Sequence, residues 1–171
     1  MRSMANTGRG LPIRTTNKLH SGDSAVRTIV VGIDPDSERH GVAYYFDGVL
    51  CYLEMMNTVG IFDKILKSNF GIDQYIFSIE NVMANQFVYA RNRKGSTANQ
   101  SKIAMHIGRC QQAQVELMRW LDHYGIPYVL HKPQKGNWAD NKAQFEKVTG
   151  WTKQSNADTR SAAYFGYLAL G

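Results

Sequence analysis

The chain has 171 residues, of which 43% are hydrophobic, so it is long enough to bury one sizeable core and too short for two ordinary domains. Its net charge of +6 is concentrated in residues 84–171, which carry 12 Lys and Arg against 5 Asp and Glu and form the expected polyanion surface. Two cysteines without CxxC or Cys/His ligand spacing indicate neither a disulfide framework nor a zinc site, and they favour a reducing cytoplasmic setting. No apolar run is long enough to span a membrane, so we expect no membrane partner.

The first 26 residues show no sustained hydrophobic period. They combine Gly, Ser, Thr and Asn with basic residues, and Asp23 is their sole acid. This composition predicts a disordered basic arm over residues 1–26, followed by a single folded domain over residues 27–171. An organelle transit peptide is the alternative, which Pro12 and the glycines disfavour because they interrupt an amphipathic helix.

Two apolar runs end in an acidic residue. Residues 29–34 read IVVGID, followed by Pro35, and residues 75–80 read YIFSIE, so each predicts a buried strand. If the two strands are parallel neighbours, Asp34 and Glu80 lie side by side at the carboxyl edge of the sheet, where ligands bind in open α/β sheets. Two carboxylates about 4 Å apart repel by roughly 4 kcal/mol at an effective dielectric of about 20, so a divalent cation is expected between them.

The remaining elements follow from turn signals and periodicity. Asp47-Gly48 suits a type I′ hairpin turn between two strands, which gives three antiparallel strands in a row. Residues 84–101 lose the apolar period and predict an exposed loop. We expect further strands at residues 41–46, 50–55 and 126–130. We expect helices at residues 58–70, where Gly71 follows as the stop, and at about 100–124, 139–149 and 156–170. The apolar face of the 100–124 helix carries Ile103, Ile107, Cys110, Leu117 and Leu121.

A third acid lies near the amino end of the last helix. Asp158 shares a helix face with Ser161, Ala162 and Phe165, and the small residues of this face would let the helix sit close to the sheet. The segment Ser155–Asp158 also fits a capping box, in which Asp158 would serve only the helix end.

Each of the three acids has an ordinary explanation when it is considered alone. Asp34 could be a turn residue before Pro35, Glu80 a rim residue and Asp158 a capping residue. Three acids from three separate elements are nevertheless what a divalent-metal site needs, and their conjunction favours that site. None of the five histidines forms an HxH or HExxH pattern, so each is interpreted as a surface or packing residue.

Three segments together resemble the RuvC-type Holliday junction resolvases of the RNase H-like superfamily: Gly32–Pro35 followed by Gly41, then Ile79–Val82, then Asp158 at the head of an Ala-rich terminal helix. The resemblance covers residues 29–171. It implies an α/β fold with a five-stranded mixed sheet, three antiparallel strands followed by two parallel ones, flanked by helices. It also implies a homodimer in a bacterial or phage-infected cell, Mg²⁺ or Mn²⁺ with two ions in each active site, and symmetric nicking of four-way DNA junctions.

The resemblance also assigns roles to individual positions. Asp34, Glu80 and Asp158 match three of the family's acidic metal ligands. The family usually has another Asp three residues after the late one; that place is Ser161 here, so the fourth ligand could be water, Ser161 or Asn156. Asp36 stands where the family typically has Gly, and it could either extend the acidic cluster or face solvent.

The predicted DNA contacts lie in two basic segments. The segment after Glu80 matches the family's junction-contacting loop and carries Phe87, Tyr89, Arg91, Arg93 and Lys94. Aromatic rings stack on unpaired bases and the cations hold phosphates, whereas the alternative is a solvated loop with stray aromatics. Lys132, Lys135 and Lys142 match a basic stretch near the site, in which Lys135 and Lys142 are the favoured phosphate contacts.

The rival functions share the fold or its first strand. A YqgF-type RNA-processing nuclease has a similar first acid motif, and a catalytically idle module that binds branched DNA would explain Ser161 in place of an acid. An actin-like ATPase needs two large lobes and phosphate-binding glycine turns that 171 residues cannot hold. The expected function is therefore a metal-dependent endonuclease that resolves four-way junctions.

Overall fold

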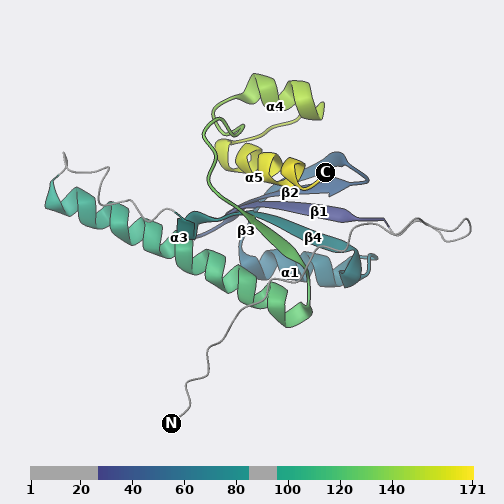
Figure 1. Cartoon of the computed structure of the whole chain (residues 1–171), viewed down its shortest axis with the longest axis horizontal. Helices are drawn as coiled ribbons and strands as arrows, with labels where there is room; N and C mark the ends of the chain where they lie inside the picture. Colours follow the sequence, from purple (N-terminus) through teal and green to yellow (C-terminus); the bar gives the residue numbers. More distant parts are fainter. Residues whose placement is uncertain (1–26, 85–95) are drawn as a thin grey trace, which may run out of the picture.

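A five-stranded sheet lies at the centre of the computed structural model, which describes residues 27–84 and 96–171 (Figure 1). The strand order is β3-β2-β1-β4-β5, with antiparallel pairing of β1 with β2 and of β2 with β3, and parallel pairing of β1 with β4 and of β4 with β5. This topology confirms the predicted α/β mixed sheet. The strands are β1 (Ile29–Asp34), β2 (His40–Phe46), β3 (Val49–Met56), β4 (Tyr75–Glu80) and β5 (Tyr128–His131).

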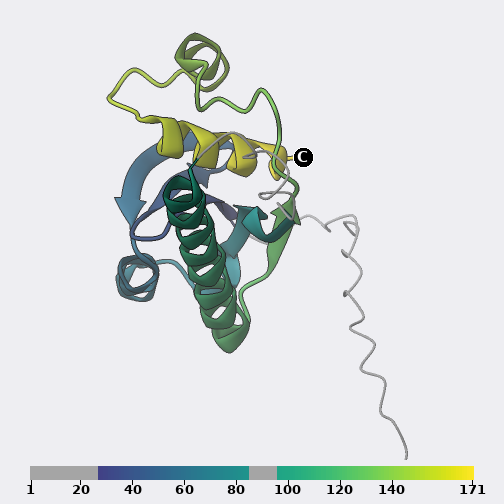
Figure 2. The same ribbon diagram turned by 90° about the vertical axis from the view of Figure 1, so that its left-hand side faces the viewer.

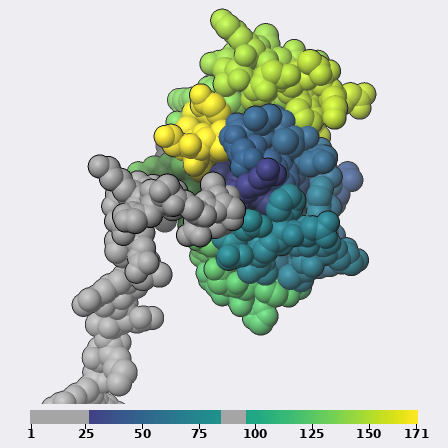
Figure 3. Space-filling view, turned by 90° about the vertical axis from the view of Figure 1, so that its right-hand side faces the viewer, coloured from purple at the N-terminus to yellow at the C-terminus, as the bar shows by residue number. Residues whose placement is uncertain are grey.

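Helices cover both faces of the sheet. They are α1 (Thr58–Lys67), α3 (Thr97–Tyr124), α4 (Lys142–Thr149) and α5 (Ala157–Leu168), with short 3₁₀ turns at Ile72–Gln74 and Val82–Ala84. Figures 1 and 2 show α1 and α3 on one face and α5 on the other, with α4 stacked outside α5. Figure 3 shows the yellow carboxyl end of α5 between the yellow-green α4 region and the blue strands. No helix within 27–84 and 96–171 has both the length and the apolar character needed to cross a membrane.

The alternation of side chains along β1 divides the core in two. Ile29, Val31 and Ile33 are fully buried in the cluster that faces α1 and α3. Val30 belongs to the second cluster, which packs against α5, and a side chain at Gly32 would point at the same helix. Because the period is two, Asp34 also faces α5.

Glycines allow α5 to lie directly on the sheet. A Cβ atom at Gly32 would come within 3.0 Å of the carbonyl oxygen of Ala162. A Cβ atom at Gly41 would also come within 3.0 Å of the carbonyl oxygen of Asp158. No side chain therefore separates the strands from the helix backbone at these two points. The expectation that small residues bring the last helix close to the sheet is confirmed, and Ser161 and Ala162 are buried in this contact.

Two predicted helix boundaries on the α1–α3 face are wrong. α1 ends at Lys67 rather than at residue 70, because Ser68 is extended and both its N–H and its hydroxyl donate to the carbonyl of Ile65. α3 begins at Thr97 rather than near residue 100, because Ser96 caps it by accepting a hydrogen bond from the N–H of Asn99 at 3.4 Å. Residues 97–101 are therefore helical and not part of the predicted loop.

Near the carboxyl end the differences are smaller. α4 starts at Lys142 instead of residue 139, since Asn141 is its cap and accepts from the N–H of Gln144 at 3.0 Å. β5 pairs with β4 from Tyr128 to His131, two residues beyond the predicted start and one beyond the predicted end. α5 runs from Ala157 to Leu168, slightly inside the predicted 156–170.

The amino-terminal half of α3 extends past the edge of the sheet (Figure 1). Cys110, Leu117 and Leu121 are buried as predicted, but Ile103 is 39% exposed and Ile107 is half-buried. The apolar face is thus longer than the body that covers it. The predicted apolar face is therefore buried only in its carboxyl-terminal part, within the residues that the structure describes.

Candidate active site

Asp34 and Glu80 end two parallel neighbouring strands. Ile33 pairs with Ile79, so the two acids follow at the same level at the carboxyl edge of the sheet. Burial, and then the charge of Glu80, raise the pKa of Asp34 to about 8, and the protonated Asp34 carboxyl donates a hydrogen bond to Glu80. Burial also raises the pKa of Glu80. A pair that retains a proton at neutral pH lacks a compensating positive charge, and a bound cation would supply that charge.

Asp158 reaches the same corner from α5. Its backbone lies against Gly41, which is the pairing partner of Asp34 in β2. The charge of Asp158 also raises the pKa of Asp34, but by less than burial, the charge of Glu80 and the hydrogen bond to Glu80 do. The structure therefore brings the three predicted acids to one region, with Asp34 and Glu80 in direct contact.

The capping role considered for Asp158 belongs to its neighbours. The Asn156 side chain accepts a hydrogen bond from the N–H of Thr159 at 2.8 Å, and the Thr159 hydroxyl accepts one from the N–H of Asn156 at 3.0 Å. This reciprocal pair is the capping box, so the interpretation of Asp158 as the cap is wrong. Asn156, a candidate fourth ligand, already uses its side-chain oxygen in the cap.

Ser161, the other candidate fourth ligand, is 2% exposed and lies beside Asp34. Its hydroxyl donates a hydrogen bond to the Asp34 carboxylate and favours the charged form, which opposes the rise in pKa caused by burial. Its oxygen in turn accepts from the side-chain amide of Asn137 at 3.2 Å. Ser161 thus holds one side of Asp34 and connects it to the segment that carries the predicted basic residues.

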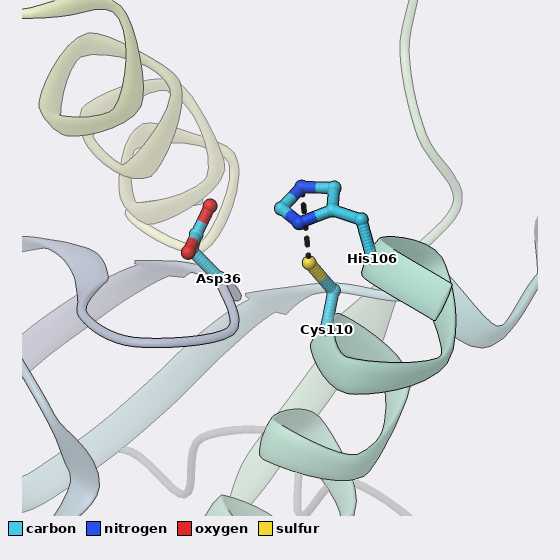
Figure 4. A group of neighbouring side chains, drawn as sticks. All are labelled: Asp36, His106 and Cys110. Atoms are coloured by element: carbon cyan, nitrogen blue, oxygen red, sulfur yellow. Dashed lines mark hydrogen bonds between the residues drawn. The ribbon is translucent and has the colours of Figure 1, made fainter. Parts of the chain in front are cut away.

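A different set of side chains forms the compact ligand group of the described residues. Asp36, His106 and Cys110 each offer a donor atom, and the three atoms all lie within 4.8 Å of one another (Figure 4). Asp36 therefore neither joins the acidic cluster nor simply faces solvent, as the two sequence interpretations had it. His106 is exposed, which agrees with the interpretation of the histidines as surface or packing residues, and its Nε2 lies 3.7 Å from Cys110 Sγ.

Other histidines do behave as packing residues. The ring of His40 is 2% exposed, its Nε2 lies 3.0 Å from the hydroxyl of Thr58, and burial lowers its pKa to about 4. His131 pairs with Glu80 in the sheet, and its Nε2 lies 2.8 Å from the Ser78 hydroxyl. Since that hydroxyl donates its one proton to the carbonyl of Phe165, His131 donates to Ser78.

The predicted junction loop lies outside the described residues. Phe87, Tyr89, Arg91, Arg93 and Lys94 all fall within 85–95, so their roles stay predictions.

The start of the predicted loop is anchored on α3. The fully buried Gln114 side chain accepts from the N–H of Val82 at 2.8 Å and donates to the Asn81 side chain at 3.0 Å. Residues 81 and 82 are therefore fixed directly after Glu80.

The second basic segment is exposed and is held by α5. Arg160 donates to the carbonyl oxygens of Trp138 and Ala139, and thereby fixes the end of the segment that carries Lys135. Lys142 forms an ion pair with Glu146 at 3.5 Å on the surface of α4. Both lysines are on the surface, where a phosphate could reach them.

Comparison with known proteins identifies the fold. No protein-family model matches the sequence, and no curated protein matches it. The chain is similar to the solved structure of Thermus thermophilus RuvC in complex with a Holliday junction substrate, with a TM-score of 0.51 and 13% identity over 82% of this chain and 90% of that chain. The fold is that of RuvC. A second structure of Thermus thermophilus RuvC matches with a TM-score of 0.48 and 14% identity, over 82% of this chain and 92% of that one.

The RuvC similarity agrees with the resemblance found in the sequence segments and confirms the RNase H-like architecture. At 13% identity it establishes the fold, and the roles of individual residues rest on the geometry of the site. That geometry consists of a half-buried carboxyl pair and a third acid from α5.

Proposed function

We propose that the protein is a metal-dependent endonuclease that resolves four-way DNA junctions by symmetric nicks. The observation that carries this proposal is the Asp34–Glu80 pair, half-buried and in contact at the carboxyl ends of adjacent parallel strands in a RuvC fold. Purely structural carboxylates are seldom buried together without a cationic partner, because their mutual repulsion and desolvation cost free energy. This arrangement supports a site built for a cation.

The donor set fits Mg²⁺ or Mn²⁺. These cations prefer oxygen ligands, and Asp34, Glu80 and Asp158 provide carboxylate oxygens from three elements. When bound, such ions lower the pKa of an attacking water and stabilise the departing 3′ oxygen of the phosphodiester. Asp34 would be the central ligand because it is hydrogen-bonded to Glu80 and interacts electrostatically with Asp158. The hydrogen bond from Ser161 fixes the orientation of the Asp34 carboxylate.

The remaining predicted residues would hold the DNA. Lys135 and Lys142 are exposed cations near α5, and phosphate contacts from such residues supply salt-dependent affinity without sequence preference. Phe87 and Tyr89 follow the segment that Gln114 fixes after Glu80, and stacking on unpaired bases at the branch point is their proposed role. Arg91, Arg93 and Lys94 would hold the neighbouring phosphates.

A symmetric substrate with two nicks suits a homodimer. Ile103 and Ile107 lie four residues apart on the part of α3 that extends past the sheet, and a second copy of the chain is the proposed cover for them. The dimer would place two acidic sites on one junction.

The decisive experiment compares substrates in the presence and absence of Mg²⁺. The protein is incubated with four-way junction, linear duplex, flap and structured RNA. Symmetric nicks in the junction alone, only with the metal, support the proposal. Cleavage of RNA alone would favour an RNA-processing nuclease, and tight junction binding without cleavage in Mg²⁺ or Mn²⁺ would favour an idle binding module.

Asp34→Asn tests the site itself. Asn has nearly the same shape but cannot supply charge to a cation, so junction binding should persist while nicking falls by about 100-fold or more. Asp63→Asn is the matched control because it removes one carboxylate from the exposed surface of α1. Nicking by Asp34→Asn at the rate of the control would remove Asp34 from the mechanism.

A further inference from the structure

We propose that Asp36, His106 and Cys110 form a second metal site, specific for Zn²⁺ and similar transition metals. The inference stands on the arrangement of these three side chains and does not depend on the nuclease proposal. Their ligand atoms lie within 4.8 Å of one another, and Figure 4 shows the His106 ring and the Cys110 thiol together on α3, with the Asp36 carboxylate across from them on the turn after β1.

The distance between sulfur and nitrogen matches a tetrahedral ion. Cys110 Sγ lies 3.7 Å from His106 Nε2. Zinc bonds of about 2.3 Å to sulfur and about 2.1 Å to nitrogen, set at the tetrahedral angle, place these two atoms about 3.6 Å apart. The separation of these two atoms therefore suits one shared ion, and a carboxylate oxygen of Asp36 lies within 4.8 Å of both as a third protein ligand.

The fold explains why the three residues meet. His106 and Cys110 are four residues apart in α3, so their side chains lie on the same helix face. That face lies against the turn that carries Asp36. Burial, and then the charge of Asp36, raise the pKa of the Cys110 thiol, and the backbone N–H of Ser37, which reaches the sulfur, opposes this rise only in part. Cys110 is 9% exposed while His106 is exposed, so the site has a buried ligand and an open side through which an ion can enter.

The donor atoms select a different class of metal from the acidic site. Sulfur and imidazole nitrogen suit borderline-soft ions such as Zn²⁺ and Co²⁺, whereas Mg²⁺ takes oxygen ligands almost exclusively. Three protein ligands leave one tetrahedral position for water or another small ligand.

Asp36 can coordinate without leaving its place in the turn. Its Oδ1 accepts hydrogen bonds from the Ser37 hydroxyl and the Glu38 N–H, both at 3.2 Å. A carboxylate has about four lone-pair sites, so these contacts leave room for a metal bond.

An ion at this position would tie the turn after β1 to α3. Asp34 is two residues before Asp36, so the ion would brace the strand end that carries one half of the acidic pair. An ion that binds the folded chain and not the unfolded chain stabilises the fold. The melting temperature should therefore rise with the logarithm of the metal concentration once that concentration exceeds the dissociation constant.

Cobalt titration of the full chain, with Mg²⁺ in excess to occupy oxygen-only sites, tests the proposal. Wild-type protein should show the near-ultraviolet thiolate-to-cobalt charge-transfer band and the visible bands of tetrahedral Co²⁺, and Zn²⁺ should displace both. Cys110→Ser should abolish the charge-transfer band, while Cys51→Ser, the control at the other cysteine, should keep it.

His106→Ala provides a variant that does not disturb the core, since this side chain is exposed. It should weaken Co²⁺ binding by about 100-fold or more, because loss of an outer-shell partner alone typically costs about 10- to 100-fold. His123→Ala, an exposed histidine in the last turn of the same helix, should bind as wild type. No charge-transfer band in the wild type, survival of the band in Cys110→Ser, or wild-type affinity in His106→Ala would each overturn the proposal.

Discussion

Gly41→Ala tests whether α5 is placed by direct contact with the sheet. The added methyl group would lie 2.6 Å from the carbonyl carbon of Asp158 and even closer to its carbonyl oxygen. Ordinary contact begins near 3.4 Å, so the helix start would have to move by at least about 0.8 Å, and by more to clear the carbonyl oxygen. The obstacle is backbone on both sides and cannot rotate away as the end of a flexible side chain can.

The size of the effect follows from two opposing contributions. Overpacking of a tight contact typically costs about 1–3 kcal/mol, whereas replacing Gly by Ala recovers about 0.4–1 kcal/mol by restricting the unfolded chain. The free energy of unfolding should therefore fall by about 1–2 kcal/mol. In a chain of this size that corresponds to a loss of roughly 2–8 °C in melting temperature.

The same movement should affect catalysis more than stability under the proposed function. A shift of about 0.8 Å carries Asp158 and Ser161 away from Asp34, and misplacement by about 1 Å can cost about 100-fold in rate. Urea unfolding and junction nicking at a temperature well below the melting point measure the two effects separately.

Gly108→Ala is the matched control, because Gly108 lies on the exposed surface of α3 with nothing within 4 Å of an added Cβ. It should gain about 0.5–1 kcal/mol. If Gly41→Ala is as stable as Gly108→Ala, α5 does not rest on the sheet in the way described.

The other predictions concern buried polar groups. Because burial lowers the pKa of His40 to about 4, the unfolded chain binds a proton that the folded chain excludes. The contribution of His40 to stability should therefore be full above pH 6.5 and fall by about 3 kcal/mol at most as the pH drops toward 4, and urea titrations of His40→Gln should lack this fall. The raised pKa of Asp34 has the opposite consequence: its contribution to the stability of the metal-free protein should fall as the pH rises from about 4 toward 8. Asp34→Asn should remove that fall, and the same pH dependence of the melting temperature in wild type and Asp34→Asn would contradict it. Gln114→Leu leaves the buried N–H of Val82 without its acceptor and should cost about 1–3 kcal/mol and speed hydrogen exchange at that amide, whereas Gln112→Leu on the exposed side of α3 should do neither.

The sheet could be predicted because its inner strands read as continuous apolar runs. The bounds of β1 and β4 agree with the runs at residues 29–34 and 75–80, and Asp47-Gly48 marks the turn between β2 and β3 with both residues at positive φ. In each case one local signal determines the structure: hydrophobic continuity for a strand buried on both faces, and turn chemistry for the hairpin. The placement of Asp34 beside Glu80 followed from these two strands.

Helix ends were harder because neighbouring residues offer competing signals. Phe70 continues the apolar period of α1, but Ser68 ends the helix first by bonding back to Ile65. At the start of α5, the segment Ser155–Asp158 fits a capping box, but Asn156 and Thr159, one residue further on, form it. The periodic pattern places a helix, whereas its first and last residues depend on hydrogen bonds that tertiary contacts select.

The cluster of Asp36, His106 and Cys110 shows what neither motif spacing nor resemblance could reveal. The four-residue spacing of His106 and Cys110 is visible in the sequence, but two ligands on one helix face do not make a site without a third from elsewhere. Asp36 would share a face with Asp34 if β1 continued, and the alternation of a strand would then place it toward α5. The strand ends before Pro35 instead, and the turn carries Asp36 to the α3 side of the sheet. One proline therefore separates two nearby carboxylates into different chemical environments: Asp34 lies beside the oxygen groups of Glu80 and Ser161, and Asp36 lies beside the sulfur and nitrogen of Cys110 and His106.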